Sequence, residues 1–333
     1  MIVMANYPIG RLIAEMRYRQ GISQEELAGN ICSVSTVSKI ENGAQMPKRK
    51  IYEALLQRLG MNPGSCTAYI SEKEMRKYTL EAEIEQLIVN RQYDKVRMAL
   101  EEYIMCDCDA GEKKGMESTE AYLDLCLQTG EGLSALEIQY VLYELAVLAQ
   151  EQLKDRERAL ELYERAVRVT MPKHTRGQVP RSQLLSRQEI RIFCKMAALW
   201  YEKGERTQAK ELLFFLKEYI EVRLGDPAEE FHTYPEILRL LAHWMGHDGR
   251  FDRQLELCER GIDLCAVQLK QCGLARLLEE KGHALAARMQ YGQAESILKQ
   301  AYSVYCAIGE SANAERLRWK ARNLFQIDIG SGS

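Results

Sequence analysis

The stretch that decides the fold of the first domain is residues 21–43, GISQEELAGNICSVSTVSKIENG. It predicts two short helices joined by a sharp turn. Ser23 is a favourable N-cap, and Glu26 three residues later completes the capping box that starts a helix. Gly29-Asn30 ends this helix, because both residues tolerate left-handed backbone. A second helix can begin at Ser33 and stop before the glycine that closes the stretch.

The second predicted helix has one buried face and one exposed face. Val37 and Ile40 lie three residues apart, the spacing of a buried helix face. Two short helices that meet at a sharp turn form the arrangement with which a helix enters the major groove of DNA. We expect base edges to be contacted by the residues at the start and on the exposed face of this helix, Ser33, Val34, Ser35, Thr36 and Lys39.

Residues 9–60 resemble the lambda-repressor-like (XRE) helix-turn-helix family, with residues 9–21 as its first helix and residues 51–60 as its last. In that family an arginine seven residues before the helix-2 glutamine pairs with a glutamate near the end of the recognition helix. The matching residues are Arg17 and Glu41, so the resemblance implies a buried ion pair between them. Between Gln24 and Gly43 the sequence is one residue shorter than the usual spacing of the family. This shorter form is similar to the variant in peptide-sensing regulators of the PlcR, Rgg and PrgX type.

Few of the predicted base-reading side chains make bidentate contacts, so affinity must depend on phosphate contacts. The candidates are Gln24 at the start of the first short helix, Asn42 after the second, and the run Lys48, Arg49 and Lys50. A basic triplet is also common in ordinary solvated turns. One such domain buries too little surface to be selective, so we expect a homodimer on a pseudo-palindromic operator.

The charge of the chain is unevenly distributed. The chain has 333 residues and a net charge of −3. Residues 1–64 hold 8 Lys/Arg against 5 Asp/Glu, which leaves 37 against 43 for the remainder. Attraction for phosphate therefore belongs to the small domain. The sequence shows no apolar run long enough to cross a bilayer and no export signal, so we expect a cytoplasmic protein with no membrane partner.

The sequence offers little support for a cofactor, a metal or an enzyme. Its ten cysteines are spread through a long chain, and we expect reduced, buried thiols, with a metal or redox role as the alternative. His243 and His247 have the spacing of zinc ligands, but Trp244 replaces the glutamate of His-Glu-x-x-His. We find no glycine-rich phosphate loop and no nucleophile motif.

After residue 64 the sequence becomes a series of helix pairs that can be aligned on each other. One column of small or apolar residues contains Val96, Ala159, Ala209, Gln254 and Ala294, and a second, twelve residues earlier, contains Ile84, Val147, Ala197, Ala242 and Gly282. This layout resembles tetratricopeptide repeats, although the column spacings exceed the period of about 34 residues. Residues 117–130 are expected to belong to a degenerate unit. Simple packing of helices without repeats remains the alternative.

These patterns predict an all-α protein. A five-helix helix-turn-helix domain (1–64) is followed by a linker helix region (65–80) and a right-handed tetratricopeptide-like array (81–309). A capping helix and a flexible tail (310–333) complete the chain. The capping helix, 311–325, is expected to bury a stripe of Ala314, Leu317, Ala321 and Leu324.

Arrays of this kind have a concave groove lined by the first helix of each pair, and such grooves bind peptides. The tetratricopeptide pattern assigns groove-facing positions to Glu144, Glu151, Arg191, Tyr201, Arg239, His243, Arg276, Glu279 and His283. This mixture of charged, aromatic and imidazole groups favours a binding surface over a packed face. Residues 91–312 contain no asparagine, whereas members of the resembled family often clamp a peptide with asparagines. Gln139, Gln150 or the arginines are possible substitutes.

The order of domains resembles the RRNPP family of cytoplasmic quorum-sensing regulators, which bind short imported peptides. The resemblance implies a DNA-binding transcriptional regulator whose groove binds a signalling peptide and thereby sets the geometry of the dimer. The alternative is a regulator whose groove binds a protein partner. We expect the signal to pass through residues 71–85, where Ser71 and Glu74 cap a helix after a Pro63-Gly64 hinge.

Overall fold

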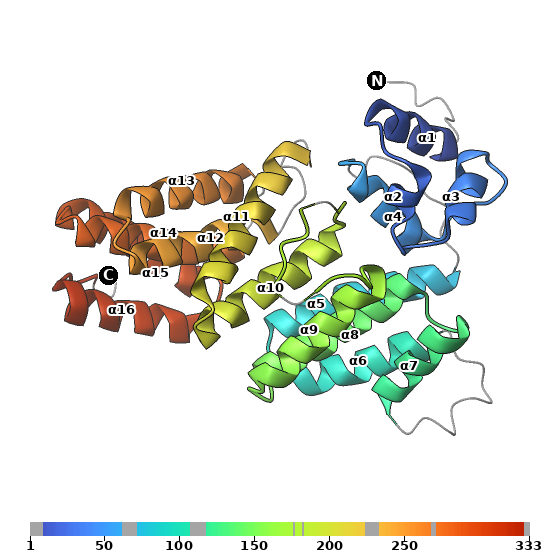
Figure 1. Ribbon diagram of the computed structural model, residues 1–333. Helices are drawn as coiled ribbons and strands as arrows, with labels where there is room; N and C mark the ends of the chain where they lie inside the picture. Colours follow the sequence, from blue (N-terminus) through green and yellow to red (C-terminus); the bar gives the residue numbers. More distant parts are fainter. Residues whose placement is uncertain are drawn as a thin grey trace, which may run out of the picture. The chain divides into compact units, whose positions relative to one another are not determined.

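The computed structural model describes residues 9–61, 72–106, 118–175, 177–181, 183–223, 233–267 and 271–329 (Figure 1). Every regular element within these ranges is an α-helix, and sixteen helices, α1 to α16, are described. The prediction of an all-α chain is confirmed. The chain divides into two compact units, Met1–Leu199 and Trp200–Ser333.

The first four helices form the N-terminal domain. They are α1 (Ile9–Arg19), α2 (Gln24–Ala28), α3 (Val34–Glu41) and α4 (Arg49–Arg58). The predicted capping box is confirmed, since the Ser23 side chain accepts from the Glu26 amide and the Glu26 carboxylate accepts from the Ser23 amide. Gly29 ends α2 in the left-handed conformation. The buried core of this domain includes Ile13, Leu27, Val37, Ile40, Tyr52, Leu55 and Leu56.

The domain was expected to have five helices within residues 1–64, but the described part of that range holds four. The fifth helix is α5 (Glu72–Val89), which begins beyond the predicted boundary. Helix α4 also begins two residues before the predicted start at residue 51, because Lys48 adopts an extended N-cap conformation. Pro63, Gly64 and Ser71, the predicted hinge and cap, lie outside the described residues.

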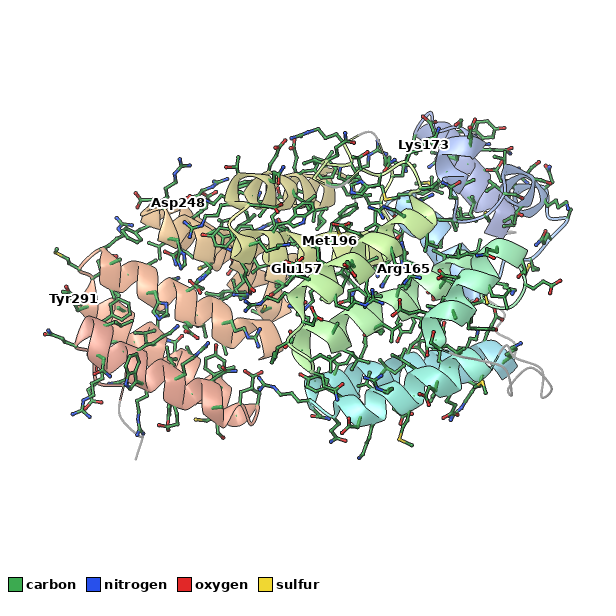
Figure 2. All side chains as sticks on the ribbon, turned by 60° about the horizontal axis from the view of Figure 1, so that its bottom comes forward. Glu157, Arg165, Lys173, Met196, Asp248 and Tyr291 are labelled. Carbon is green, nitrogen blue, oxygen red and sulfur yellow. The ribbon has the colours of Figure 1, made fainter. Side chains whose placement is uncertain are left out.

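The rest of unit 1 contains α5, α6 (Tyr93–Met105), α7 (Thr119–Thr129), α8 (Ala135–Glu151) and α9 (Arg156–Thr170), followed by the start of α10 (Arg187–Lys203). Helices α5 and α6 pack as one pair, and α8 and α9 as another. The predicted degenerate unit is the single helix α7. Arg165 of α9, labelled in Figure 2, holds α7 through Glu120 and through Asp124 at 2.8 Å.

Unit 2 also contains paired helices. Its remaining helices are α11 (Arg206–Arg223), α12 (Thr233–His247), α13 (Phe251–Val267), α14 (Gln271–Ala287), α15 (Tyr291–Ala307) and α16 (Ser311–Phe325). Helices α12 and α13 pack together, as do α14 and α15. In Figure 2, Asp248 lies in the short turn between α12 and α13. Tyr291 is the first residue of α15 and directly follows the short turn after α14.

The two predicted columns of small or apolar residues lie in the interior. Val96, Ala159, Ala209 and Ala294 are fully buried, as are Ile84, Ala197 and Ala242, and both Val147 and Gln254 are nearly so. Gly282 shows why a small residue is needed there, because a Cβ at this position would lie 2.4 Å from Leu298 Cδ2. The columns therefore mark the positions at which paired helices approach most closely.

Helix α16 covers the end of the array, as predicted for a capping helix. Ala314, Leu317 and Ala321 are buried against α14 and α15. Leu324 was expected on the same stripe, but 62% of it is exposed. The helix reaches its last turn there, and Ile327 and Ile329 after it supply the buried apolar groups instead. The predicted flexible tail, 330–333, lies outside the described residues.

The seven cysteines whose side chains are described are all free thiols. Four of them are buried, as expected for small packed side chains: Cys126, Cys194, Cys258 and Cys265. Cys32 and Cys106 are partly exposed and Cys306 is exposed, which differs from the expectation. Burial raises the pKa of the Cys258 and Cys265 thiols. The side chain of Cys272, and Cys108 with its surroundings, are not described.

Candidate nucleic-acid interface and ligand-binding residues

Helix α3 presents the predicted base-reading residues in two groups. Val34, Ser35 and Lys39 are exposed, and Val34 has 43% of its surface open to solvent. Ser33 is the N-cap: its Oγ accepts from the Thr36 amide at 3.0 Å and also lies 2.8 Å from Thr36 Oγ1. The hydroxyls of Ser33 and Thr36 are therefore engaged in the cap, whereas Val34, Ser35 and Lys39 are open to a DNA groove.

Arg17 and Glu41 form the ion pair implied by the sequence. Arg17 donates from Nε and Nη2 to the two carboxylate oxygens of Glu41, at 2.7 and 2.9 Å, and from Nη1 to the Ile22 carbonyl at 2.9 Å. Burial alone would raise the pKa of the Glu41 carboxyl, but hydrogen bonds from Arg17 and Gln24 outweigh it and hold that pKa below its ordinary value. One amide donor of Gln24 is thus used inside the domain, joining α2 to α3.

The predicted phosphate-binding residues differ in their surroundings. Asn42 and Lys48 are exposed, and Asn42 has a long hydrogen bond of 3.5 Å to Ser38. Lys48 stands at the N-terminal end of α4, where the helix dipole adds to its positive charge. These two residues, of the five predicted, are the most accessible to a DNA backbone.

Arg49 and Lys50 are instead held by carboxylates and aromatic rings. Arg49 Nε lies 2.7 Å from Glu53, and its guanidinium lies 4.0 Å from the ring centroid of Tyr78 in α5. Lys50 lies 2.7 Å from Glu81, also in α5. A phosphate would have to compete with these carboxylates. Of the predicted run Lys48, Arg49 and Lys50, only Lys48 is exposed, and Arg49 and Lys50 are partly buried.

Arg58 links the N-terminal domain to the array. Its Nη1 donates to the carbonyls of Leu27 and Ala28 at the end of α2, both at 3.0 Å. Its Nη2 donates to Glu189 Oε1 of α10 at 3.2 Å. The side chains of Arg58 and Glu189 are 3% and 0% exposed, so this is a buried ion pair. It joins α4, and through it the end of α2, to the start of α10.

Glu189 continues this network into two further helices. Its Oε1 accepts from Thr170 Oγ1 of α9 at 2.6 Å, and its Oε2 accepts from the Ser186 amide at 2.6 Å. Thr170 Oγ1 accepts in turn from Gln139 Nε2 of α8 at 2.7 Å. The ends of α8, α9 and α10 are thus connected to the N-terminal domain by charged and polar groups that are shielded from water, where such bonds are strong.

Apolar contacts accompany these bonds. Leu136 of α8 packs with Ile31 and Ala54 in a small buried cluster. The Arg187 amide of α10 also donates to Gln57 Oε1 of α4 at 3.0 Å. The contact between α4 and the array therefore has both apolar and polar parts.

The residues predicted to line a groove in unit 1 are unequally accessible. Arg191 is partly exposed, and its Nη1 lies 3.3 Å from Glu85 while its guanidinium lies 5.0 Å from the Tyr143 ring. Glu151 is half-buried. Glu144 was expected to face solvent, but it is fully buried in α8. Charged groups of α5 and α10, namely Glu85, Arg191 and Lys195, act on the pKa of this buried carboxyl.

In unit 2 the predicted residues divide in the same way. His243 is partly exposed, and its Nδ1 lies 2.9 Å from Glu280. Tyr201 was expected to be open but is buried, because its ring stacks on Trp244 with centroids 4.3 Å apart and an angle of 4° between the planes. Of the other two arginines predicted, Arg239 is half-buried beside Glu236 and Arg276 is exposed.

Glu279 was also expected in an open groove and is buried instead. Tyr305 and Arg316 donate to its Oε2 at 2.8 and 2.9 Å, and Lys320 donates to its Oε1 at 3.1 Å. The capping helix supplies both cations. His283 lies 4.0 Å from the same carboxylate, and burial lowers its pKa. These contacts cover the Glu279 carboxylate, so it is not accessible on the predicted groove surface.

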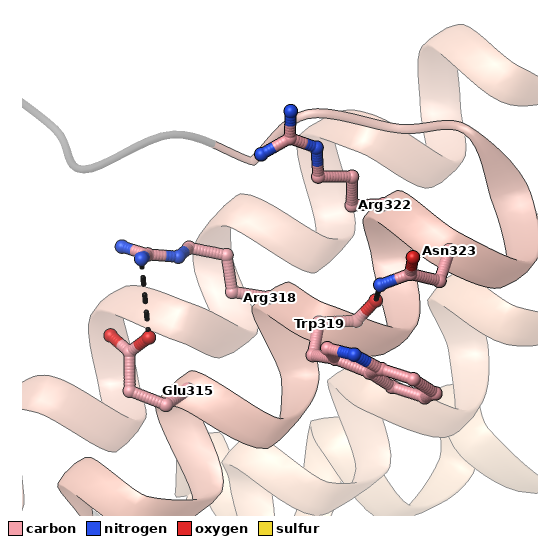
Figure 3. Close-up of a pocket in the computed structure, with 5 residues that line it drawn as sticks. All are labelled: Glu315, Arg318, Trp319, Arg322 and Asn323. Atoms are coloured by element: carbon pink, nitrogen blue, oxygen red, sulfur yellow. Dashed lines mark hydrogen bonds and ion pairs between the residues drawn. The ribbon is translucent and has the colours of Figure 1, made fainter.

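Within the described ranges no group of His, Cys, Asp and Glu has the arrangement of a metal site. No helix in the part of the chain that the structure describes is long and apolar enough to cross a membrane. A pocket on α16 is lined by Glu315, Arg318, Trp319, Arg322 and Asn323, with Arg318 3.3 Å from Glu315 (Figure 3). All five residues belong to one helix.

Residues 8–65 match the model of a helix-turn-helix domain family. The N-terminal part of this chain is a helix-turn-helix domain. The match covers the capping box, the exposed face of α3 and the Arg17–Glu41 pair. It supports the prediction of a DNA-binding transcriptional regulator in place of an enzyme.

Over most of its length the chain has a fold similar to that of a solved protein. PlcR of Bacillus thuringiensis, solved with the peptide PapR7 and DNA, is 18% identical, with a TM-score of 0.55 over 93% of this chain and 98% of that one. Its apo form is 16% identical, with a TM-score of 0.52 over 93% and 97%. No curated protein sequence matches the chain. The helix-turn-helix domain followed by a tetratricopeptide-like array is therefore one known architecture.

The residues that sequence reasoning missed lie mainly in the contact between α4 and the array. Ser186 and Glu189 form a capping box at the start of α10, and Ser134 and Glu137 form another at the start of α8. The pattern Ser-x-x-Glu was readable in both places. Nothing in the sequence near Glu189 indicates its second role as the ion-pair partner of Arg58, which lies 131 positions away.

Proposed function

We propose that this regulator binds a short signalling peptide in its helical array and that the peptide controls how two helix-turn-helix domains are presented to DNA. The observation that carries the proposal is the fold shared with PlcR over both parts of the chain. PlcR has been solved with a peptide and DNA together. The repeat pattern of the array, with its row of charged and aromatic residues, supports the same assignment of peptide binding to the array and DNA binding to the helix-turn-helix domain.

DNA would be read by α3. Val34, Ser35 and Lys39 are exposed on this helix, and their methyl, hydroxyl and ammonium groups can meet a thymine methyl, several base edges and guanine acceptors, respectively. Lys48 and Asn42 would contact phosphates. Because one domain of this size buries little surface, a homodimer on a pseudo-palindromic operator is proposed.

The signal would pass through α4. A ligand acts only when its affinity differs between two states. Helix α4 contacts α5 through Arg49 and Lys50, and α10 through Arg58. A ligand that displaces α5 or α10 therefore changes the contacts that position the helix-turn-helix domain.

The base-reading part of the proposal is tested by operator selection from a random duplex library. Replacing both Ser35 and Lys39 by Ala should change the preferred operator, because these residues contact base edges. Selection of the same operator by this double variant would contradict the assignment of α3.

The regulatory part is tested by distance measurements between spin labels on the two helix-turn-helix domains. The full-length protein is labelled at an exposed position such as Gln45, and a pool of synthetic heptapeptides serves as the ligand probe. A changed distance distribution is expected when peptide is retained. Altered operator affinity at an unchanged distance would contradict this mechanism and indicate local ordering of α3.

The alternative is that the array binds a protein partner. It is favoured by the burial of Glu144, Tyr201 and Glu279, which leaves fewer open side chains for a peptide, and by the absence of asparagine from residues 91–312. Stoichiometric co-purification of one protein from the native cell, with no peptide retained, would support it.

A further inference from the structure

Glu144 is a buried carboxylate that lacks a hydrogen-bond partner. It lies in the middle of α8 and is 0% exposed. Neither of its carboxylate oxygens has a partner among the described residues. Buried polar groups in proteins are nearly always satisfied, and an unpaired buried carboxylate is strongly unfavourable. Such a group therefore requires an explanation.

The cations around Glu144 are engaged elsewhere. Arg191 of α10 lies 3.3 Å from Glu85 of α5 and stacks over Tyr143. Lys50 of α4 is paired with Glu81, and its ammonium lies 4.2 Å from the ring of Tyr140. The charged and titratable groups that act on Glu144 or on the rings beside it are Lys50 of α4, Glu81 and Glu85 of α5, Tyr140, Tyr143 and Glu151 of α8, Tyr163 of α9, and Arg191 and Lys195 of α10.

Burial raises the pKa of Glu144 to about 7. Near neutral pH, a substantial part of the molecules therefore carry this carboxyl in its protonated, neutral form. Leaving a neutral carboxyl without a partner costs less free energy than leaving an ionised one, which requires a cation. Glu144 can thus accept a cation and release a proton as it does so.

The pair of Arg191 and Glu85 is more exposed than the pair of Lys50 and Glu81 in this cluster. Their side chains are 32% and 58% exposed, whereas Glu144 is covered. A partly exposed ion pair is weaker than a fully buried one, so a ligand can exchange this pair at a lower cost than a buried pair such as Arg58 and Glu189. An incoming cation that displaces Arg191 would meet the Glu85 carboxylate, the Tyr143 ring and then Glu144. Carboxylates and an aromatic face are the groups that bind ammonium and guanidinium ions.

We propose that Glu144, Glu85 and Tyr143 form a subsite for a cationic group of the bound peptide, which takes the place of Arg191. The group is an ammonium or guanidinium ion, from the peptide's N-terminus or from a Lys or Arg side chain. This inference rests on the proposed peptide-binding function. The competing arrangement is internal: Arg191 turns from Glu85 to Glu144, and no ligand cation is required.

The test uses the full-length protein and three pools of random heptapeptides. One pool has free N-termini and no Lys or Arg, one has acetylated N-termini with Lys and Arg, and one is acetylated and lacks both. Retained peptides are identified by mass spectrometry. Retention from the first or second pool, with none from the third, is expected and also distinguishes the two sources of the cation. Equal retention from all three pools overturns the subsite.

A retained peptide is then synthesised, and its affinity is measured by calorimetry at pH 6 and pH 8. Because the cation requires ionised Glu144, affinity should be about tenfold higher at pH 8 for a peptide held by Lys or Arg, and about fourfold higher for one held by its N-terminal ammonium, which is partly deprotonated at pH 8. Proton release should appear as a dependence of the binding heat on the ionisation enthalpy of the buffer. The wild-type protein suffices for this measurement, so it does not depend on the folding of a variant.

Glu144→Gln should weaken binding of the same peptide at pH 8 by about tenfold or more and remove the pH dependence. Glu101→Gln, at an exposed position of α6, is the matched control and should change neither. Unchanged affinity and pH dependence in Glu144→Gln overturn the subsite. If no pool is retained at all, the proposed peptide-binding function itself fails, which is a different result from retention without a preference for cations.

Discussion

Arg58 and Glu189 are 131 positions apart in the sequence, yet Arg58 Nη2 donates to Glu189 Oε1 at 3.2 Å in a buried ion pair. Arg58 also binds the carbonyls that end α2, and Glu189 also accepts from Thr170. One guanidinium therefore connects the helix-turn-helix motif to the array. Under the function proposed above, this contact is a route by which a ligand in the array could act on the helix-turn-helix motif.

Arg58→Ala and Glu189→Ala should each destabilise unit 1 strongly. Each leaves the other charge buried without its ionic partner, which costs about 3–5 kcal/mol. Urea denaturation followed by circular dichroism measures the change. Glu295→Ala breaks the exposed pair of Glu295 and Lys299 and should cost no more than about 1 kcal/mol. Similar losses for the buried and exposed pairs would show that Arg58 and Glu189 are hydrated in solution.

Gly10→Ala should disrupt the N-terminal domain. A Cβ at Gly10 would lie 1.7 Å from the Ile40 carbonyl oxygen, so α1 and the end of α3 would have to separate. Operator affinity and the melting temperature of the domain should both fall. Gly292→Ala is the matched control, because nothing lies within 4 Å of its Cβ and alanine favours a helix by about 0.5–1 kcal/mol. Normal DNA binding by Gly10→Ala would contradict the close packing of α1 on α3.

The helix-turn-helix motif was predictable because its signals are local. Ser23 and Glu26 form a capping box within one turn, and Gly29 ends the same helix, so neighbouring residues determine both ends of α2. The column of small residues in the array was also predictable, because each helix pair repeats the same close approach. Gly282 and Leu298 illustrate the physical cause.

Exposure in the array was not predictable from the repeat pattern. The pattern gives the helix face on which Glu144 and Glu279 lie, but it does not show what covers that face. Glu279 is covered by Arg316 and Lys320 of the capping helix. Lys50 likewise forms an ion pair with Glu81, which lies on a different helix. Pairings between distant segments depend on the packing of whole helices, which spacing along one helix does not specify.

Lys48→Ala should weaken binding to all DNA sequences alike. Lys48 is exposed, so it is available to a phosphate, and its loss should reduce the slope of log affinity against log salt concentration by about 1. Lys50→Ala should have a smaller effect, because Lys50 is paired with Glu81. Binding isotherms at several salt concentrations provide the measurement. Equal slopes for the two variants would indicate that the contact between α4 and α5 opens when DNA binds.

Glu144→Gln should stabilise the protein in a pH-dependent way, independently of any ligand. Burial raises the pKa of Glu144 from 4.5 to about 7, so in this window the unfolded chain loses a proton that the folded protein retains. Wild-type stability therefore falls as the pH rises from 4.5 to 7, by about 3 kcal/mol for this group. The variant lacks this loss. Its advantage over wild type should be about 1 kcal/mol or less at pH 5 and about 3 kcal/mol at pH 8.

Urea denaturation of both proteins at the two pH values measures this difference, since the titration of all other groups cancels between them. Glu101→Gln, at an exposed site, should differ from wild type by the same small amount at pH 5 and pH 8. A constant difference for Glu144→Gln as well would mean that Glu144 is ionised in the folded protein throughout this range. In that case Arg191 has turned from Glu85 to pair with it, and the carboxylate is satisfied without a ligand.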